Sequence, residues 1–133
     1  MFGPRSAIPI RGPARPSCWV TWAIVDLDEY QQLALRTAAP RDKPGEVFHL
    51  LLGLVGEAGE IAEKAKKIVR DRNGDFAGWD RDDLTKELGD TLWYLAVLAD
   101  HFDLSLDTVA RTNIAKLADR QRRGTLHGSG DDR

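Results

Sequence analysis

Apolar residues recur along this sequence at the spacing of α-helices, and no stretch of convincing length alternates as a β-strand does. The first helical stretch begins after Asp26, which has Glu29 three positions later in the arrangement of a capping box. It is expected to end near Thr37, because Pro40 cannot continue a helix. Gln31 lies away from the apolar stripe of this helix and is expected to face solvent.

Two long helices are predicted for the middle of the chain, over about residues 47–70 and 82–102. The first half of the earlier helix, VFHLLLGLVGEAG, is apolar nearly all round, which indicates burial on more than one side. In a chain of this size, such a segment favours contact with a second subunit. The polar segment between the two helices, residues 73–80, contains the turn signal Asn-Gly and is expected to be a loop.

A fourth helix is predicted to follow Ser105, a good N-cap residue, and to end near Gln121. Residues 1–25 contain four of the six prolines and several arginines, and we interpret them as a flexible extension. Residues 122–133 form a Gly-rich C-terminal tail. The sequence therefore predicts an all-α fold, in which residues 26–121 form one domain of four helices.

Each of the two long helices carries a pair of acidic residues three positions apart, Glu57 with Glu60 and Glu87 with Asp90. At about 100° per residue, both members of a pair lie on the same side of the helix. Both pairs border an apolar stripe. In the second helix the stripe comprises Leu84, Leu88, Leu92, Leu95 and Leu98. If the two stripes pack against each other, all four carboxylates converge at the seam.

Four carboxylates that share a partly buried place cannot all stay ionised without a counter-charge. Mg²⁺ supplies that charge, with Mn²⁺ as a possible substitute, and both ions take carboxylate oxygens readily. The alternative is a solvated acidic face paired with Lys64 and Lys67, but two such pairs beside the core favour a metal site. As metal ligands and catalytic residues, the sequence offers Glu57, Glu60, Glu87 and Asp90.

Candidate substrate contacts lie next to these acids. Lys67 can meet phosphate groups or pair with Glu63 one turn earlier, and the sequence favours neither. For Lys64 it favours pairing within the helix, with Glu60. Tyr94 lies beside the second acidic pair, where its ring could stack on a nucleobase or pack in an interface.

The fourth helix supplies three more candidates for substrate binding. Asn113 is a polar residue in a mostly apolar face, and a polar group in such a place needs a partner. Lys116 and Arg120 are four positions apart and lie next to Asn113, so the three residues form a strip that could face phosphates. Surface pairing of the cations, for example with Asp119, is the alternative.

The composition is that of an ordinary soluble domain, with 42% hydrophobic and 30% charged residues. A net charge of −2 argues against stable nucleic-acid binding, which normally requires a basic surface. The single Cys18 excludes an intramolecular disulfide framework, and no cluster of Cys and His suggests zinc. Residues 1–22 lack the apolar core of a signal peptide, and nothing approaches a membrane span. These features fit a reducing cytoplasm.

The segments GLVGEAGEIAEKAKK, KELGDTLWYLAVLAD and NIAKLADRQRRGTLHGSGDDR resemble the short, single-domain MazG-like nucleotide pyrophosphohydrolases of the all-α NTP pyrophosphatase superfamily. The likeness covers about residues 26–133. The family pattern of an ExxE pair followed by ExxD maps onto Glu57, Glu60, Glu87 and Asp90. Many members have a Glu doublet at the first motif, and here the first of those positions is Gly56, which leaves the number of metal ions open.

This resemblance implies a four-helix MazG-like fold, with the metal site on the two central helices and assembly as a homodimer or dimer of dimers. It implies Mg²⁺-dependent hydrolysis of a nucleoside triphosphate to the monophosphate and pyrophosphate, as in nucleotide-pool sanitation or dNTP control. A phosphoribosyl-ATP pyrophosphohydrolase-like enzyme and a non-catalytic helical dimerisation module are the alternatives. A ferritin-like di-iron bundle is disfavoured because it uses Glu-x-x-His pairs, and neither acidic pair here contains His.

Overall fold

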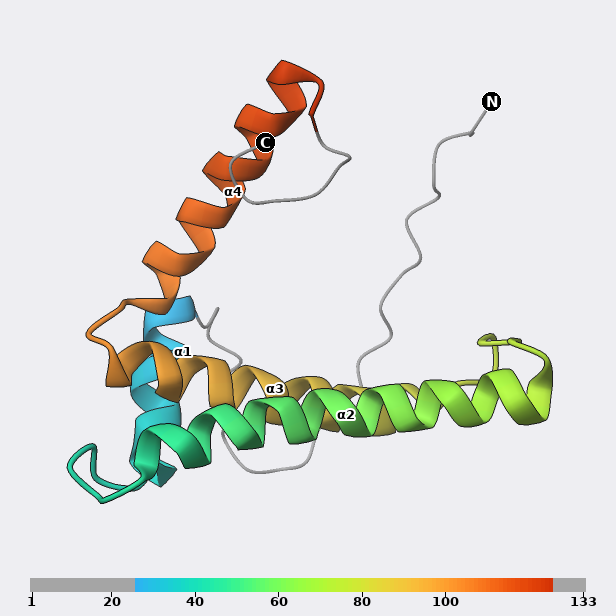
Figure 1. The fold of residues 1–133 in the computed structure, drawn as a ribbon, viewed down its shortest axis with the longest axis horizontal. Helices are drawn as coiled ribbons and strands as arrows, with labels where there is room; N and C mark the ends of the chain where they lie inside the picture. Colours follow the sequence, from blue (N-terminus) through green and yellow to red (C-terminus); the bar gives the residue numbers. More distant parts are fainter. Residues whose placement is uncertain (1–25, 126–133) are drawn as a thin grey trace, which may run out of the picture.

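A computed structural model describes residues 26–125, which form four α-helices and no β-strand (Figure 1). The helices are α1 (Leu27–Ala34, continued by a 3₁₀ turn, Leu35–Thr37), α2 (Glu46–Arg72), α3 (Arg81–His101) and α4 (Leu106–Arg123). The predicted all-α architecture is confirmed, and each boundary lies within two residues of the expected one. α4 extends to Arg123, into the segment assigned to the tail. The predicted N-terminal extension and residues 126–133 lie outside the described part of the chain.

Three helices begin at polar side chains that accept hydrogen bonds from backbone N–H groups of the first turn. Asp26 caps α1 at 2.7 Å, Asp80 caps α3 at 2.9 Å, and Ser105 caps α4 at 3.1 Å. These N–H groups have no partner within the helix, so each cap satisfies a donor that would otherwise need water. The caps predicted at Asp26 and Ser105 are therefore confirmed.

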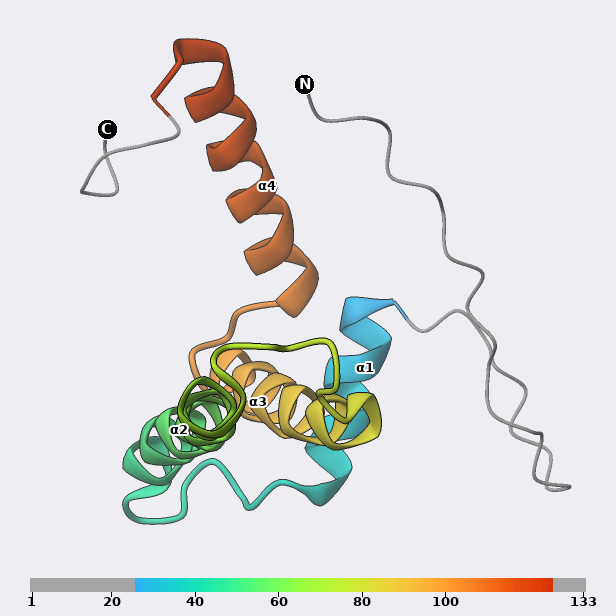
Figure 2. The ribbon, with the colours of Figure 1, turned by 90° about the vertical axis from the view of Figure 1, so that its right-hand side faces the viewer.

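α2 and α3 form a long antiparallel hairpin, and they lie side by side along most of their length (Figures 1 and 2). Gly53 permits a close approach between them, because a Cβ atom there would lie only 2.2 Å from Cε1 of Tyr94. Gly56 and Gly59 follow Gly53 at intervals of three residues, but a Cβ at either position would meet nothing within 4 Å. Of these three glycines, only Gly53 is therefore required by the packing of α2 on α3.

The hydrophobic core lies at the end of the hairpin where α1 crosses it and α4 begins. Leu50 of α2 is completely buried there. The leucine stripe of α3 does not lie wholly inside this core, since Leu88 and Leu95 are largely exposed. The buried residues of the core are Ala34, Leu50, Ala96, Val97, Ala99 and Leu106.

Gln31 is buried, with 4% exposure, and the prediction that it faces solvent is wrong. Its amide nitrogen donates to the carbonyl oxygens of Ala96 and Leu104, both at 3.0 Å. Its amide oxygen accepts the backbone N–H of Leu106 at 3.0 Å. Gln31 thus links α1 to backbone groups of α3 and of the loop before α4. It also gives the buried N–H of Leu106, the first residue of α4, a partner that the helix itself cannot supply.

α4 leaves the hairpin and projects away from it (Figures 1 and 2). Its first turn is held by Asp28 of α1, which accepts hydrogen bonds from the Ser105 hydroxyl at 2.7 Å and from the Asp107 N–H at 3.1 Å. The hydrogen bond from Ser105, followed by that from Asp107, lowers the pKa of Asp28. Beyond this turn α4 exposes apolar residues, among them Ile114 and Leu117.

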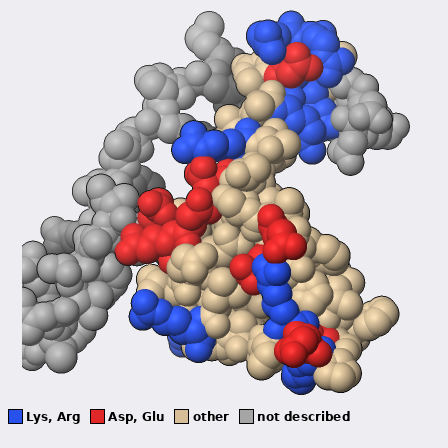
Figure 3. All heavy atoms as spheres, turned by 90° about the vertical axis from the view of Figure 1, so that its left-hand side faces the viewer, with Lys and Arg blue, Asp and Glu red and all other residues tan. Residues whose placement is uncertain are grey.

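Charged side chains are distributed unevenly between α4 and the rest of the domain. Figure 3 shows the side on which α1 and the loop before α2 lie, and there acidic and basic side chains are neighbours below α4. Arg41 of this loop pairs with Asp100 at 2.9 Å and with Asp103 at 2.7 Å. Basic residues occupy the last turn of α4.

No helix within residues 26–125 combines the length and apolar character needed to cross a lipid bilayer.

Candidate functional site

Three acidic side chains converge at the seam between α2 and α3. Glu57 of α2 and Glu87 and Asp90 of α3 each place a carboxylate oxygen so that these oxygens all lie within 4.8 Å of one another. Glu87 is buried, Glu57 is half-buried and Asp90 is exposed. The convergence expected from the two spaced pairs is therefore found for three of the four acids.

Glu60, the fourth predicted acid, is exposed and lies outside this group. It is nevertheless close enough to act on Glu57. Burial raises the pKa of Glu57 above the ordinary range of a glutamate, and the negative charges of Glu60, Asp90 and Glu87 raise this pKa further, in that order. Glu60 thus belongs to the same electrostatic site, on its solvent side.

Lys64 reaches across the seam from α2 to α3. Its ammonium group lies 2.7 Å from the carboxylate of Asp83 and 2.7 Å from Oε1 of Glu87. The expected pairing with Glu60 inside α2 is therefore wrong, because two acids of α3 lie nearer to the amine. These hydrogen bonds, first that of Asp83 and then that of Glu87, raise the pKa of Lys64, which stays charged at neutral pH.

The bridge to Asp83 is the part of the site that the sequence analysis missed. A signal is present in retrospect, because Asp83 precedes Glu87 by one helical turn and therefore lies on the same face of α3. Lys64 likewise follows Glu60 by one turn on α2. Charge spacing alone leaves two ways of pairing, within a helix or between helices, and only the packing of α2 on α3 decides between them.

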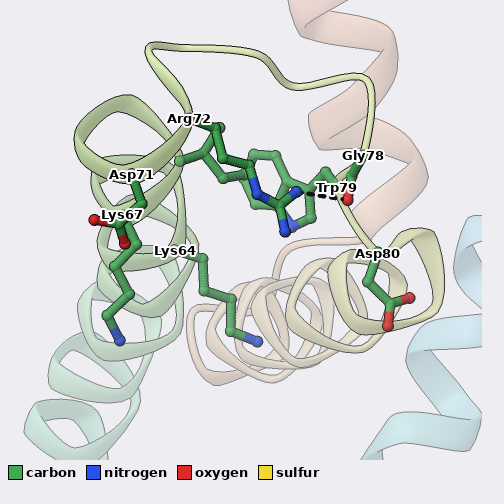
Figure 4. Close-up of a pocket in the computed structure, with 8 residues that line it drawn as sticks. Lys64, Lys67, Asp71, Arg72, Gly78, Trp79 and Asp80 are labelled. Atoms are coloured by element: carbon green, nitrogen blue, oxygen red, sulfur yellow. Dashed lines mark hydrogen bonds between the residues drawn. The ribbon is translucent and has the colours of Figure 1, made fainter.

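Lys67 lies one turn beyond Lys64 (on the carboxyl side), and its amine is 3.7 Å from Glu63 of the same helix. Both lysines line a pocket of about 260 Å³ between the end of α2 and the loop that leads to α3 (Figure 4). Trp79 and Arg72 line the pocket opposite the lysines, and Arg72 donates to the carbonyl of Gly78 at 2.9 Å. None of the three converging acids lines this pocket, but Lys64, which lines it, also bonds to Glu87.

Tyr94 lies on α3 one turn after Asp90, on the side of the carboxylates opposite to the pocket. Its ring packs against Gly53 of α2 and meets Trp93 edge-on, with ring centroids 4.9 Å apart. Trp93 is itself fixed to the 3₁₀ turn after α1, because its Nε1–H donates to the hydroxyl of Thr37 at 2.9 Å. The position of Tyr94 beside the acids agrees with the sequence analysis.

The three candidates on α4 are not gathered at this site within one chain. Asn113 and Lys116 are exposed, and Arg120 is buried in the last turn of the helix. α4 carries all three away from the hairpin that holds the carboxylates (Figures 1 and 2).

The donor set at the seam matches the preference of a hard divalent cation. Carboxylate oxygens are the ligands that Mg²⁺ and Mn²⁺ take, and three of them from two helices can share one ion. No histidine belongs to this group of described residues, so the donor set is not that of a di-iron bundle. Exposure of Asp90 leaves one side of the group accessible from solvent.

Comparison with known proteins gives two matches. A model of a protein family, described as the MazG nucleotide pyrophosphohydrolase domain, matches residues 47–125 and so includes α2, α3 and α4. The Gene 37 protein of Mycobacterium phage L5 is 53% identical to this chain over 85 residues, which are 64% of this chain and 75% of the phage protein. No solved structure matches the chain at a significant level.

Proposed function

The chain belongs to the family of MazG nucleotide pyrophosphohydrolase domains, and we propose that it is a Mg²⁺-dependent nucleoside triphosphate pyrophosphohydrolase. Its substrate is an NTP or dNTP, which it hydrolyses to the nucleoside monophosphate and pyrophosphate. The observation that carries this proposal is the group of three carboxylates, Glu57, Glu87 and Asp90, whose oxygens lie within 4.8 Å of one another between the two central helices.

In this proposal Glu57, Glu87 and Asp90 would hold the ion through their carboxylate oxygens. Bound Mg²⁺ would polarise the phosphoryl group of the nucleotide and offset its negative charge. Glu60, exposed beside Glu57, accepts a proton from the attacking water. The water oxygen then bonds to the α-phosphorus, and the bond from this phosphorus to the bridging oxygen breaks, which releases pyrophosphate.

The residues on either side of the carboxylates contact the rest of the substrate. Tyr94 offers its ring to the nucleobase at one end of the site. Lys67 offers its ammonium to phosphate oxygens at the other end, where its distance of 3.7 Å to Glu63 leaves it in only a weak ion pair. The polar strip of α4, formed by Asn113, Lys116 and Arg120, lies too far along a projecting helix to serve the same chain. Its exposed members, Asn113 and Lys116, would contact substrate bound to a neighbouring subunit, with Arg120 buried one turn further along the helix.

A homo-oligomer also accounts for the apolar surface of α2. Phe48, Leu52 and Val55 are 68%, 72% and 70% exposed in the single chain. They lie on the first half of α2, the half that also carries Gly53 and Glu57. Exposed apolar residues that cluster in this way mark a contact surface rather than a solvated one. A second copy of the chain would cover them, as a homodimer or within a dimer of dimers.

A double variant with Phe48→Lys and Leu52→Lys is expected to dissociate this oligomer. Each chain would place two lysines in the interface, and symmetry doubles the effect, so the dissociation constant should rise by at least about 10²-fold. Sedimentation at micromolar concentration measures it. Val69→Lys is the control, because Val69 is an exposed apolar residue in the other half of α2. A wild-type protein that is a compact folded monomer at this concentration would contradict the assembly.

The activity is tested by a panel of canonical, damaged and uracil-bearing nucleoside triphosphates, assayed with Mg²⁺ for pyrophosphate release. Release of pyrophosphate and monophosphate in equal amounts is expected for at least one of them. Phosphoribosyl-ATP is included in the panel, and its selective cleavage would favour the related enzyme instead. A non-catalytic dimerisation module would cleave none of the compounds, and neither Mg²⁺ nor nucleotide would raise its melting temperature.

A further inference from the structure

The ammonium group of Lys64 bonds to one acid of the carboxylate group and to one acid outside it. It lies 2.7 Å from Oε1 of Glu87, one of the three converging acids, and 2.7 Å from Asp83, which is not one of them. Lys64 is the only basic residue of α2 or α3 for which a described ion pair joins the two helices. Figure 4 shows its side chain reaching from α2 toward α3, whereas the side chain of Lys67 stays beside α2.

The ion pair between Lys64 and Glu87 is partly buried, and this strengthens the attraction between the two charges. The side chain of Glu87 is 12% exposed and that of Lys64 is 28% exposed, so water screens their charges less than at an open surface. Glu57 and Asp90 add two more negative charges within 4.8 Å of Glu87. A positive charge fixed at this place reduces the repulsion among the three acids.

We propose that Lys64 is the built-in counter-ion of the carboxylate group, shared between Asp83 and Glu87 in the metal-free protein and held by Asp83 alone once a divalent cation occupies Glu87. This inference rests on the metal site of the proposed function. Two positive charges close to one carboxylate repel each other, so the cation and Lys64 compete for Glu87. Asp83 lies one turn before Glu87 and accepts the same ammonium, so Lys64 can leave Glu87 without losing its last ion pair.

Lys64 is thus a positioning residue that sets how tightly the site binds its metal. If Lys64 and the metal compete for Glu87, replacing Lys64 should change the metal affinity in a direction that a purely structural ion pair does not predict. Removal of the ammonium should tighten metal binding although it makes the metal-free protein less stable. Removal of the Asp83 charge should weaken metal binding, because Lys64 then has only Glu87 as its partner and competes with the metal for it.

The test is Mg²⁺ and Mn²⁺ binding by titration calorimetry on the full-length chain without nucleotide, together with metal-free thermal melting. Lys64→Met should bind Mg²⁺ about tenfold more tightly than wild type and should melt at a lower temperature without metal. Asp83→Asn should bind Mg²⁺ several-fold more weakly. Lys64→Arg, which keeps the charge, should restore an affinity near that of the wild type.

Two control variants separate this local effect from the general change in charge. Lys66→Met removes a cation of α2 that pairs with Glu63 instead, and Asp82→Asn removes another acid from the first turn of α3. Neither should change the Mg²⁺ affinity by more than about twofold. If Lys64→Met binds Mg²⁺ equally or more weakly while the wild type binds it well, the counter-ion role is wrong and the proposed enzyme stands. A wild type that binds neither ion would overturn both.

Discussion

Gln31→Leu is expected to lower the free energy of unfolding by about 2 kcal/mol. Leucine has a similar volume, so the core around this position stays filled. The buried N–H of Leu106 would, however, lose its partner, and the carbonyl groups of Ala96 and Leu104 would each lose one hydrogen bond from Gln31. Each buried polar group without a partner costs about 1–3 kcal/mol, and a small domain is stable by only about 5–15 kcal/mol.

Urea denaturation followed by circular dichroism measures this loss, and Gln32→Leu is the matched control. Gln32 is the next residue of α1 and is exposed, so its replacement should change the free energy of unfolding by less than about 0.5 kcal/mol. Equal stability of the two variants would show that the three backbone groups find other partners. It would then remove Gln31 as the link between α1, the end of α3 and the start of α4.

The helices of this domain are predictable because their signals are local. Asp26 and Ser105 cap helices within three residues of themselves, and these caps need no knowledge of the rest of the fold. The apolar periodicity of the two central helices likewise depends only on neighbouring residues. This is why the helix boundaries agree with the sequence analysis to within two residues.

Gln31 and Lys64 are not predictable in the same way, because their partners lie far along the chain. The groups bound by Gln31 are 65 to 75 residues away. Lys64 bonds to residues 19 and 23 positions away, although an acid one turn earlier in its own helix was available. The direction of α4, and hence the position of Asn113, also depends on how the helices pack. No local rule fixes it.

Glu60 illustrates the limit of the spacing argument at the site itself. Residues three apart share a helix face, so the sequence treats Glu57 and Glu60 alike. The seam between two packed helices is narrower than a helix face. Of the two acids on α2, only Glu57 lies in the seam with Glu87 and Asp90. The Glu87 and Asp90 pair of α3 has the same spacing, yet both of its members reach the group. The spacing therefore identifies the candidates, and the packing selects among them.

Neutralising Glu57 or Asp90 should leave the metal-free stability unchanged or higher, while the activity falls. The raised pKa of Glu57 means that its charged form is less favourable in the folded chain than in the unfolded one. This penalty is absent below the ordinary pKa of a glutamate, grows as the pH rises from that pKa to the raised one, and is complete above the raised pKa. Glu57→Gln and Asp90→Asn should therefore keep or raise the metal-free melting temperature at pH 7. Glu87→Gln should not raise it, because Glu87 also binds Lys64.

Activity should respond in the opposite direction. Glu57→Gln, Glu87→Gln and Asp90→Asn each remove a proposed metal ligand, so they should lose both the stabilisation by Mg²⁺ and about 10²- to 10⁴-fold or more in turnover. Glu60→Gln should lose a similar factor in turnover yet keep the stabilisation by Mg²⁺, because it removes the base and not a ligand. Thermal melting with and without Mg²⁺, beside pyrophosphate release from the preferred nucleotide, measures both, with the exposed Glu29→Gln on α1 as the control. Purely structural acids would behave differently: their variants would melt lower without metal and turn over nucleotide normally, and that result would sink the assignment.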